Sequence, residues 1–262
     1  MNASAIGRTL ANFGSKAGPF LICLALWQAI TMMQFTDPAY LPGVGAVAEA
    51  FYDLAKERTI FRELGYSLFT AFTGLLLGVC IGVPLGAAMA LSRGADGFFG
   101  PLIKATYSLP KSALIPLFVL WFGVGGLTNI LAATLTTLLP IVIYTYHGVH
   151  GVPQIFVWSA QAFGTPRGRM LARIILPAAL PAILTGIRIA LGFAFIVTVA
   201  AEMIVSNYGI GKLMFFYGDS GAYNYMFAAV ITVVVAAFIA DRIFVVASDY
   251  ILRWQEPADR DV

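Results

Sequence analysis

Charged residues are scarce in this 262-residue chain, and their scarcity excludes most classes of soluble protein. Asp, Glu, Lys and Arg together make up 11% of the sequence, whereas soluble domains carry about 25%. Apolar residues reach 60%, which is too many for a disordered segment, a collagen-like repeat or a solvated globular enzyme. The composition therefore predicts an all-α protein that crosses a membrane several times.

Cysteine and histidine are also rare, which removes further possibilities. Cys23 and Cys80 lie inside apolar runs and predict neither a disulfide nor a metal site. His147 and His150 lack a third ligand, so no metal site is expected. The sequence contains neither an HExxH zinc motif nor a GxxxxGK[ST] phosphate loop, so the chain is expected to be no enzyme and to bind no cofactor. A net charge of +3 is too small to indicate nucleic-acid binding.

Long stretches without charge predict six membrane-spanning helices in the lipid bilayer. Crossing the hydrocarbon core takes about 20 apolar residues, and one charge-free stretch, 112–166, is long enough for two crossings. The predicted spans are 18–36, 66–91, 103–122, 127–147, 178–205 and 223–246. They form one transmembrane domain over 18–246, flanked by an N-terminal tail, 1–17, and a C-terminal tail, 247–262. Eleven Lys and Arg residues lie on the side of the tails against four on the other side, which predicts cytoplasmic termini.

Two segments remain open to more than one interpretation. The segment 44–63 has apolar residues at helical spacing among charged ones, so it predicts a helix that either lies on the outer membrane surface or packs over the bundle. The third span contains Pro110 and Pro116, which disturb a helix. This span either borders a solute route, with Lys111 near its cytoplasmic mouth, or is a kinked packing helix with a snorkelling lysine.

A cytoplasmic loop over 147–177 is longer than a connection between two helices requires. Pro153 is suited to begin a helix and Gly164 to end one, so a short helix is expected over 153–163. Several of its side chains are large and apolar: Ile155, Phe156, Val157, Trp158 and Phe163. Exposed apolar area of this kind is typical of a surface that binds a partner.

The end of this loop resembles the cytoplasmic EAA signature of ABC importer permeases, EAA-x3-G-x9-I-x-LP. Gly164 is followed, after nine residues, by Ile174, Leu176 and Pro177. Segments over 115–123, 176–191 and 200–203 are similar to the nitrate, sulfonate, taurine and bicarbonate branch of these permeases. The resemblance extends over about 41–205.

The resemblance implies a type I importer permease in a bacterial plasma (inner) membrane. In that family the loop helix docks on a separate ATPase subunit, which binds ATP and Mg. A second copy of the permease and an external solute-binding protein are the other implied partners. The implied coupling residues are Phe156, Trp158, Ser159, Ala160, Phe163, Gly164, Ile174, Leu176 and Pro177. Where the signature begins Glu-Ala-Ala, this chain has Trp158-Ser159-Ala160, which removes a carboxylate and offers Trp158 as an apolar anchor.

Arg188 is the one charged residue in the stretch 174–201, which covers most of the fifth predicted span. At mid-depth a guanidinium costs at least about 2.5 kcal/mol unless it faces a partner, a cavity or the bundle interior, and no acidic residue is expected at the same depth. One interpretation is a path for an anion, since guanidinium binds oxyanions well. The other is an arginine bonded to backbone carbonyls or to a neighbouring subunit. The candidate path residues are Lys111, Arg188, Gly192, Phe195 and Glu202.

The sequence therefore favours the membrane-spanning subunit of an ATP-driven importer, assembled as a homodimer. Its expected solute is a small anion such as nitrate, bicarbonate, taurine, a sulfonate or a related carboxylate. The alternative is a self-contained secondary carrier or channel. A carrier would be expected to hold ion-coupling carboxylates inside several spans, and only Glu202 qualifies.

Overall fold

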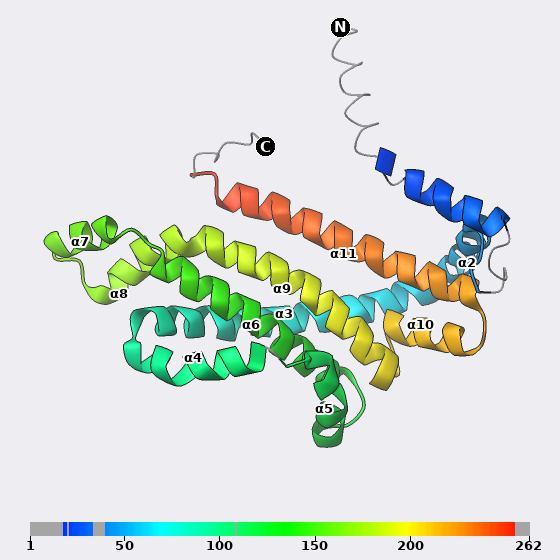
Figure 1. Ribbon diagram of the computed structural model, residues 1–262, viewed down its shortest axis with the longest axis horizontal. Coiled ribbons are helices and arrows are strands. Elements are labelled where there is room, and N and C mark those ends of the chain that lie inside the picture. The colour runs from blue at the N-terminus through cyan, green and yellow to red at the C-terminus, as the bar shows by residue number, and fades with distance from the viewer. Residues whose placement is uncertain (1–17, 20, 34–39, 108, 255–262) are drawn as a thin grey trace, which may run out of the picture. The chain divides into compact units, whose positions relative to one another are not determined.

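The computed structural model describes residues 18–19, 21–33, 40–107 and 109–254, and every regular element in these ranges is a helix (Figure 1). The predicted all-α class is therefore confirmed. The chain forms two compact units, one that combines 1–61 with 213–231 and one that combines 62–212 with 232–262.

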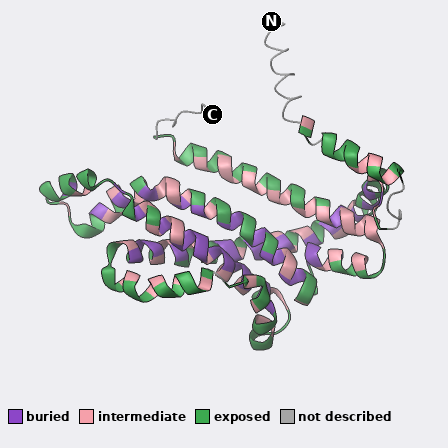
Figure 2. Cartoon of the chain, viewed as in Figure 1, coloured by how far each residue is buried: buried purple, intermediate pink, exposed green. Residues whose placement is uncertain are grey.

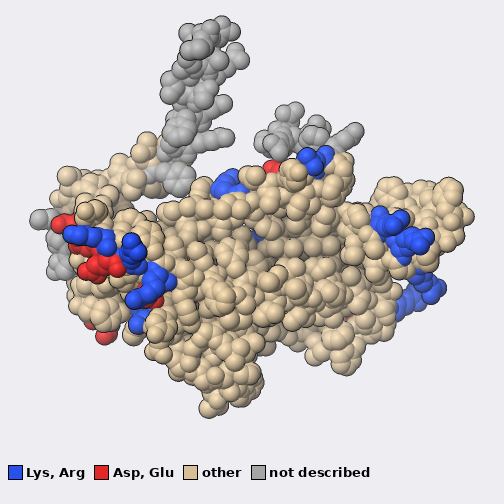
Figure 3. All heavy atoms as spheres, turned by 180° about the vertical axis from the view of Figure 1, so that it is seen from behind, with Lys and Arg blue, Asp and Glu red and all other residues tan. Residues whose placement is uncertain are grey.

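Four helical stretches of the described chain are long and apolar enough to cross a membrane. They are α3 (Thr59–Leu91), α6 (Gly126–His150), α11 (Tyr223–Ile251) and the continuous stretch Arg167–Val205, which joins α8 (Arg167–Met170), the π-helical turn η2 (Leu171–Ile175) and α9 (Leu176–Val205). They correspond to the predicted spans 66–91, 127–147, 223–246 and 178–205. On the face shown in Figure 3, charged side chains gather in groups and leave a broad surface with few of them, as expected for helices in hydrocarbon.

The first predicted span and the tails fall partly outside the described residues. Within the span 18–36, an apolar helix covers Leu21–Met32. The predicted tail 1–17 lies outside the described residues, and so do 255–262. The helix α11 continues to Ile251, which lies within the predicted C-terminal tail, 247–262.

The third predicted span, 103–122, is not a single helix. Three shorter elements replace it: α4 (Arg93–Tyr107), η1 (Lys111–Leu114), which is a 3-10 turn, and α5 (Ile115–Phe122). Pro110 lies at the break with an extended backbone, φ −71° and ψ 102°, because it has no N–H to continue the helix. Pro116 lies in the first turn of α5, where proline is tolerated.

The predicted helix within 44–63 is α2 (Val44–Lys56). Val47 and Leu54 on this helix are buried, whereas Phe51 is 41% exposed. A helix that lay free on the membrane surface would bury neither of the first two residues against protein. The burial therefore favours the packing interpretation.

Close backbone approach holds α3 against α6 in the second unit. Four glycines of α3 recur at every fourth position and face α6: Gly74, Gly78, Gly82 and Gly86. A Cβ added at Gly86 would lie 2.6 Å from the carbonyl oxygen of Val142, so no larger residue fits there. A stripe of small residues that lets two helices approach closely is typical of packing in membranes.

Glycines also allow α6 and α9 to approach closely, and the core of the second unit lies along these two helices. A Cβ at Gly186 of α9 would overlap Tyr144, and one at Gly148 of α6 would overlap Ala182. Figure 2 shows buried positions concentrated along α6 and α9. The second unit is therefore built around these two helices and α3.

We predict that Gly86→Ala lowers the stability of the detergent-solubilised protein by about 1–3 kcal/mol, because the added methyl group overpacks the contact between α3 and α6. The measurement is the midpoint of thermal unfolding. Gly65→Ala is the matched control, since Gly65 lies in α3 with no atom within 4 Å of an added Cβ. Alanine there should leave the midpoint unchanged or raise it. Equal midpoints for the two variants would contradict the packing described.

Candidate functional site

The helix α7 (Gln154–Ala162) carries an apolar surface that nothing in the described chain covers. It matches the helix predicted over 153–163. The side chains of Ile155, Phe156, Trp158 and Phe163 are between 51% and 89% exposed, and together they form what we call the α7 surface. Such a concentration of exposed apolar area is typical of a docking site.

The opposite side of the loop packs on the core. Ala160 is buried in a cluster with Val149, Met170 and Ile175, and Ile174 and Leu176 pack against the same cluster. Ser159 is exposed. The signature residues thus divide into outward-facing and inward-facing groups, and the inward-facing group anchors the loop.

Gly164 ends α7 in the way the sequence predicts. Its φ is +69°, a left-handed conformation that glycine adopts without strain. The N–H of Gly164 donates to the carbonyl of Gln161 at 2.9 Å, and that of Thr165 donates to Ala160 at 3.0 Å, which satisfies carbonyls at the helix end. Pro177 lies in the first turn of α9. The elements α8, η2 and α9 form one continuous helix, Arg167–Val205, which we call the α9 arm. Because α7 packs on this arm through Ala160, a displacement of α7 would be passed to α9.

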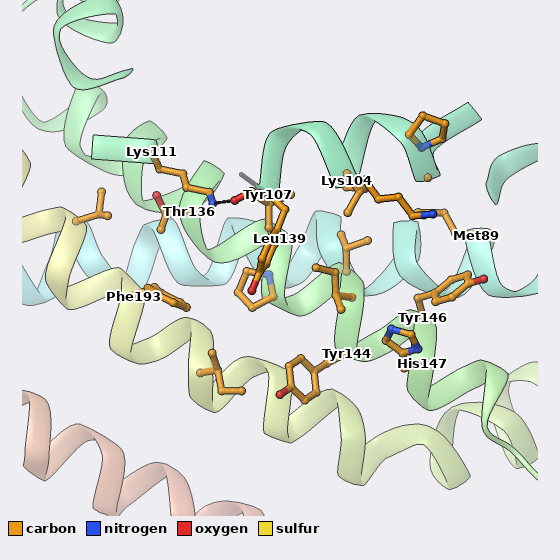
Figure 4. Close-up of a pocket in the computed structure, with 18 of the residues that line it drawn as sticks. Met89, Lys104, Tyr107, Lys111, Thr136, Leu139, Tyr144, Tyr146, His147 and Phe193 are labelled. Carbon is orange, nitrogen blue, oxygen red and sulfur yellow. Dashed lines mark hydrogen bonds between the residues drawn. The ribbon is translucent and has the colours of Figure 1, made fainter. Parts of the chain in front are cut away.

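A cavity of about 1190 Å³ lies among α4, η1, α6 and α9. Figure 4 shows Lys104 and Tyr107 of α4, Lys111 of η1 and Tyr144 of α6 among the residues that line it. Most of the lining is apolar, and its polar members also include Asp96, Ser112, Thr136, Tyr146 and His147. A largely apolar hollow with a few polar groups is the usual form of a small-molecule site.

The two lysines of the cavity differ in what they bind. Lys111 Nζ donates to the carbonyl oxygen of Tyr107 at 2.6 Å and lies 5.2 Å from the centre of that tyrosine ring. This lysine therefore caps the end of α4. Lys104 makes no hydrogen bond or ion pair within the described residues. Its ammonium is the cation of the cavity that is available to an anion.

The face of α9 that lines the cavity differs from the predicted one. Its lining residues are Ile189, Phe193, Ile196, Val197 and Ala200. Gly192 and Phe195 each precede one of these by a single position, which is a rotation of about 100° around a helix. Phe195 is 6% exposed and packs in the core. Of the five predicted path residues, the structure places only Lys111 in the cavity, and the role of the others as solute contacts stays a prediction.

The expectation that no acidic residue lies at the depth of Arg188 was wrong. Its Nε and Nη2 donate to the two carboxylate oxygens of Asp241 in α11, at 2.7 and 2.9 Å. Asp241 lies ten residues before the end of α11, and Arg188 lies twelve residues after the start of α9. The depths agree because α11 extends beyond the predicted end of its span.

Glu202 is 1% exposed and lies in a polar cluster between α9, α3 and the start of α10 (Ile210–Asp219). Its carboxylate accepts a hydrogen bond from Ser67 Oγ at 2.7 Å and one from the N–H of Gly211 at 3.0 Å. The backbone N–H of Gly209 donates to the carboxylate of Glu63 at 2.6 Å, and the backbone N–H of Ile210 donates to Ser67 Oγ at 2.9 Å. Anionic groups are stabilised at a helix N-terminus, so this cluster caps α10.

Glycine is required where this cap closes. Gly209 has φ +111°, and a Cβ there would overlap the Glu202 carboxylate. Sequence reasoning missed this arrangement, together with Lys104 and Asp241. The glycine pair Gly209 and Gly211 is the signal in the sequence that could have indicated a close backbone approach.

A metal site is not found among the described residues, where no three His, Cys, Asp or Glu side chains come together. His147 lines the cavity, and the ring of His150 stacks on Tyr146 at 5.7 Å. Of the two histidines, His147 therefore belongs to the wall of the cavity, and His150 packs on the lining residue Tyr146.

Comparison with known families shows the family to which the chain belongs. Residues 78–249 match the model of the family described as binding-protein-dependent transport system inner membrane component. The chain belongs to this family. The match covers every element from α4 to α10, most of α11 and the last part of α3, from 78 to 91. The resemblance to ABC importer permeases is therefore confirmed.

Individual members of the permease family are similar over most of the chain. The taurine transport system permease protein TauC of Escherichia coli (strain K12) is 32% identical over 86% of this chain and 83% of its own length. A putative aliphatic sulfonates transport permease protein, SsuC of Bacillus subtilis (strain 168), is 29% identical over 89% and 85%. These relatives place the permease in the taurine and sulfonate type.

Solved structures show the same fold at lower identity. An inward-facing conformation of the MetNI methionine ABC transporter matches with a TM-score of 0.62 and 20% identity, over 76% of this chain and 97% of that one. An amino acid ABC transporter with histidines matches with a TM-score of 0.61 and 16% identity, over 78% and 98%. The permease therefore has the type I importer fold.

Proposed function

We propose that this permease is the membrane-spanning subunit of an ATP-driven importer that carries a small organic anion of the taurine and sulfonate class. The single observation on which the coupling role rests is the exposed α7 surface at the end of the α9 arm. The relatives named for taurine and aliphatic sulfonates support the solute class.

The proposed topology has six spans and two cytoplasmic termini in a bacterial inner membrane. Four spans are the long apolar helices, and Leu21–Met32 and the segment α4–α5 supply the other two. The distribution of basic residues supports this orientation. It puts α7 on the cytoplasmic side, where an ATPase that binds ATP and Mg would reach it.

The assembly proposed is a homodimer with two ATPase subunits and an external solute-binding protein. Nucleotide-driven closure of the ATPase subunits would bring the two α7 helices together. Because α7 is anchored to the α9 arm through Ala160 and Ile174, the movement would reach the cavity wall at Phe193 and Ile196. Transport is then a two-state equilibrium that ligand and nucleotide bias in opposite directions.

Within the cavity, Lys104 is proposed to contact the anionic head of the solute, and the apolar wall to contact its carbon atoms. A charge-assisted hydrogen bond from an ammonium suits a sulfonate oxygen. Proton- or sodium-driven transport receives no support, since the buried carboxylates of Glu63 and Glu202 cap α10 and Asp241 binds Arg188.

Trp158→Asp and Phe163→Asp are predicted to abolish co-purification of the permease with its ATPase, because each places a charge in the apolar docking surface. Both residues are more than half exposed, so membrane insertion and thermal unfolding should be unchanged.

Trp254→Asp is the matched control for the docking experiment. Trp254 is 60% exposed, close to the 62% of Trp158, and belongs to no part of the α7 surface. This variant should retain the ATPase. Retention of the ATPase by both α7 variants would show that docking occurs elsewhere.

Lys104→Gln is predicted to lower the maximal rate of taurine or alkanesulfonate uptake by about tenfold or more, which corresponds to the loss of one charge-assisted hydrogen bond. Lys104→Arg should retain most of the rate. Lys212→Gln serves as the control, because Lys212 binds the carbonyl of Asn207 and lies outside the cavity. An unchanged rate for Lys104→Gln would remove this lysine from the solute path.

A further inference from the structure

A two-point ion pair joins α9 to α11 inside the second unit. The guanidinium of Arg188 and the carboxylate of Asp241 meet side by side, with donor–acceptor distances of 2.7 and 2.9 Å. Two parallel hydrogen bonds fix both the separation and the orientation of the groups. The side chains are 48% and 30% exposed, so the pair lies at the edge of the helix contact.

Beyond Thr232, the part of α11 that belongs to the second unit is packed lightly against the core. Only 11% of its most apolar stretch is buried, and the part that contacts the core is one stripe: Val233, Ala237, Ala240 and Phe244. In hydrocarbon such a stripe gains nothing from the hydrophobic effect, because lipid tails would cover it equally well. An apolar stripe also allows sliding, whereas a forked ion pair defines one register.

The groups around the pair do not compete strongly for either partner. A hollow of about 130 Å³ beside it is lined by Thr185, Ser248 and Asp249 along with apolar residues. Arg242, the neighbour of Asp241, lies over the ring of Phe238 at 5.0 Å. Arg188 therefore has Asp241 as its bonded acid.

The position of Arg188 connects this pair to the coupling loop. Arg188 lies on the same continuous helix, Arg167–Val205, that carries η2 and is anchored to α7. The neighbouring residue on this helix, Ile189, lines the cavity. A rigid link at Arg188 would therefore make α11 move whenever the ATPase moves α9.

We propose that Arg188 and Asp241 are a positioning pair that makes α11 follow α9 during transport, and that Arg188 does not contact the solute. The inference rests on the proposed importer function. The positioning role is nevertheless separate from the choice of solute, because the pair acts between two helices of one chain and needs no particular solute.

Charge exchange separates positioning from solute contact. In the reconstituted complex, Arg188→Gln and Asp241→Asn are each expected to lower ATP-driven uptake by about tenfold or more, while ATP hydrolysis changes less than the uptake does. The double variant Arg188→Asp with Asp241→Arg restores the pair in reverse and should recover most of the uptake. Failure of the exchanged pair to recover uptake in an assembled, ATP-hydrolysing complex would overturn the proposal.

A covalent link provides a second test that does not depend on how well the reversed charges insert. Cys23 and Cys80 are first replaced by alanine, and Arg188→Cys and Asp241→Cys are then introduced together. Uptake should be low before cross-linking and should rise when a short bismaleimide joins the two thiols. Uptake that stays low or falls after complete cross-linking would show that α9 and α11 must move against each other, which would overturn the proposal.

The parent complex, which lacks only Cys23 and Cys80, identifies a failure of the underlying function. If this complex hydrolyses ATP but moves no taurine or alkanesulfonate, the proposed function fails before the ion pair is tested. If the parent complex transports the solute but neither charge exchange nor cross-linking recovers uptake, the proposed function stands and only the positioning proposal fails.

Discussion

Helices in a bilayer gain nothing by turning apolar side chains toward one another, because lipid tails offer an equally apolar surface. Association must therefore come from close backbone approach and from polar groups that find partners. The second unit of this permease shows both. Glycines of α3 allow close backbone packing against α6, and Gly186 allows the same between α9 and α6. Arg188 is hydrogen-bonded to Asp241, and Glu202 accepts a hydrogen bond from the N–H of Gly211.

The difference between lipid and water also explains why the α7 surface is informative. Apolar side chains in lipid need no explanation, but Phe163 and Trp158 are exposed on a short helix outside the proposed spans. In water such a surface is unfavourable unless a partner covers it. Family membership indicates the class of partner. The packing of Ala160 and Ile174 in one cluster is the proposed route by which docking would reach the cavity.

Local signals in the sequence predicted the local features well. Proline and glycine positions located α7 to within a residue at each end, since helix termini depend on a few neighbouring residues. Charge-free runs likewise located α3, α6, α9 and α11. The break at Pro110 was visible, but its consequence, two separate short helices, depends on how the chain packs afterwards.

Contacts between distant helices could not be predicted in the same way. The face of α9 that lines the cavity differs from the predicted face by one residue, because helical periodicity gives relative angles and no absolute direction. The partner of Arg188 depended on where α11 ends. The environment of Glu202 depends on the backbone around Gly209, which packs against the Glu202 carboxylate. Residue spacing within α9 does not predict this tertiary contact.

The most direct measurement is uptake of labelled taurine or a short alkanesulfonate into vesicles that hold the permease with its ATPase and solute-binding protein. The account predicts accumulation that requires all three components and stops when a non-hydrolysable ATP analogue replaces ATP. Accumulation by the permease alone, driven by an ion gradient and indifferent to nucleotide, would contradict it.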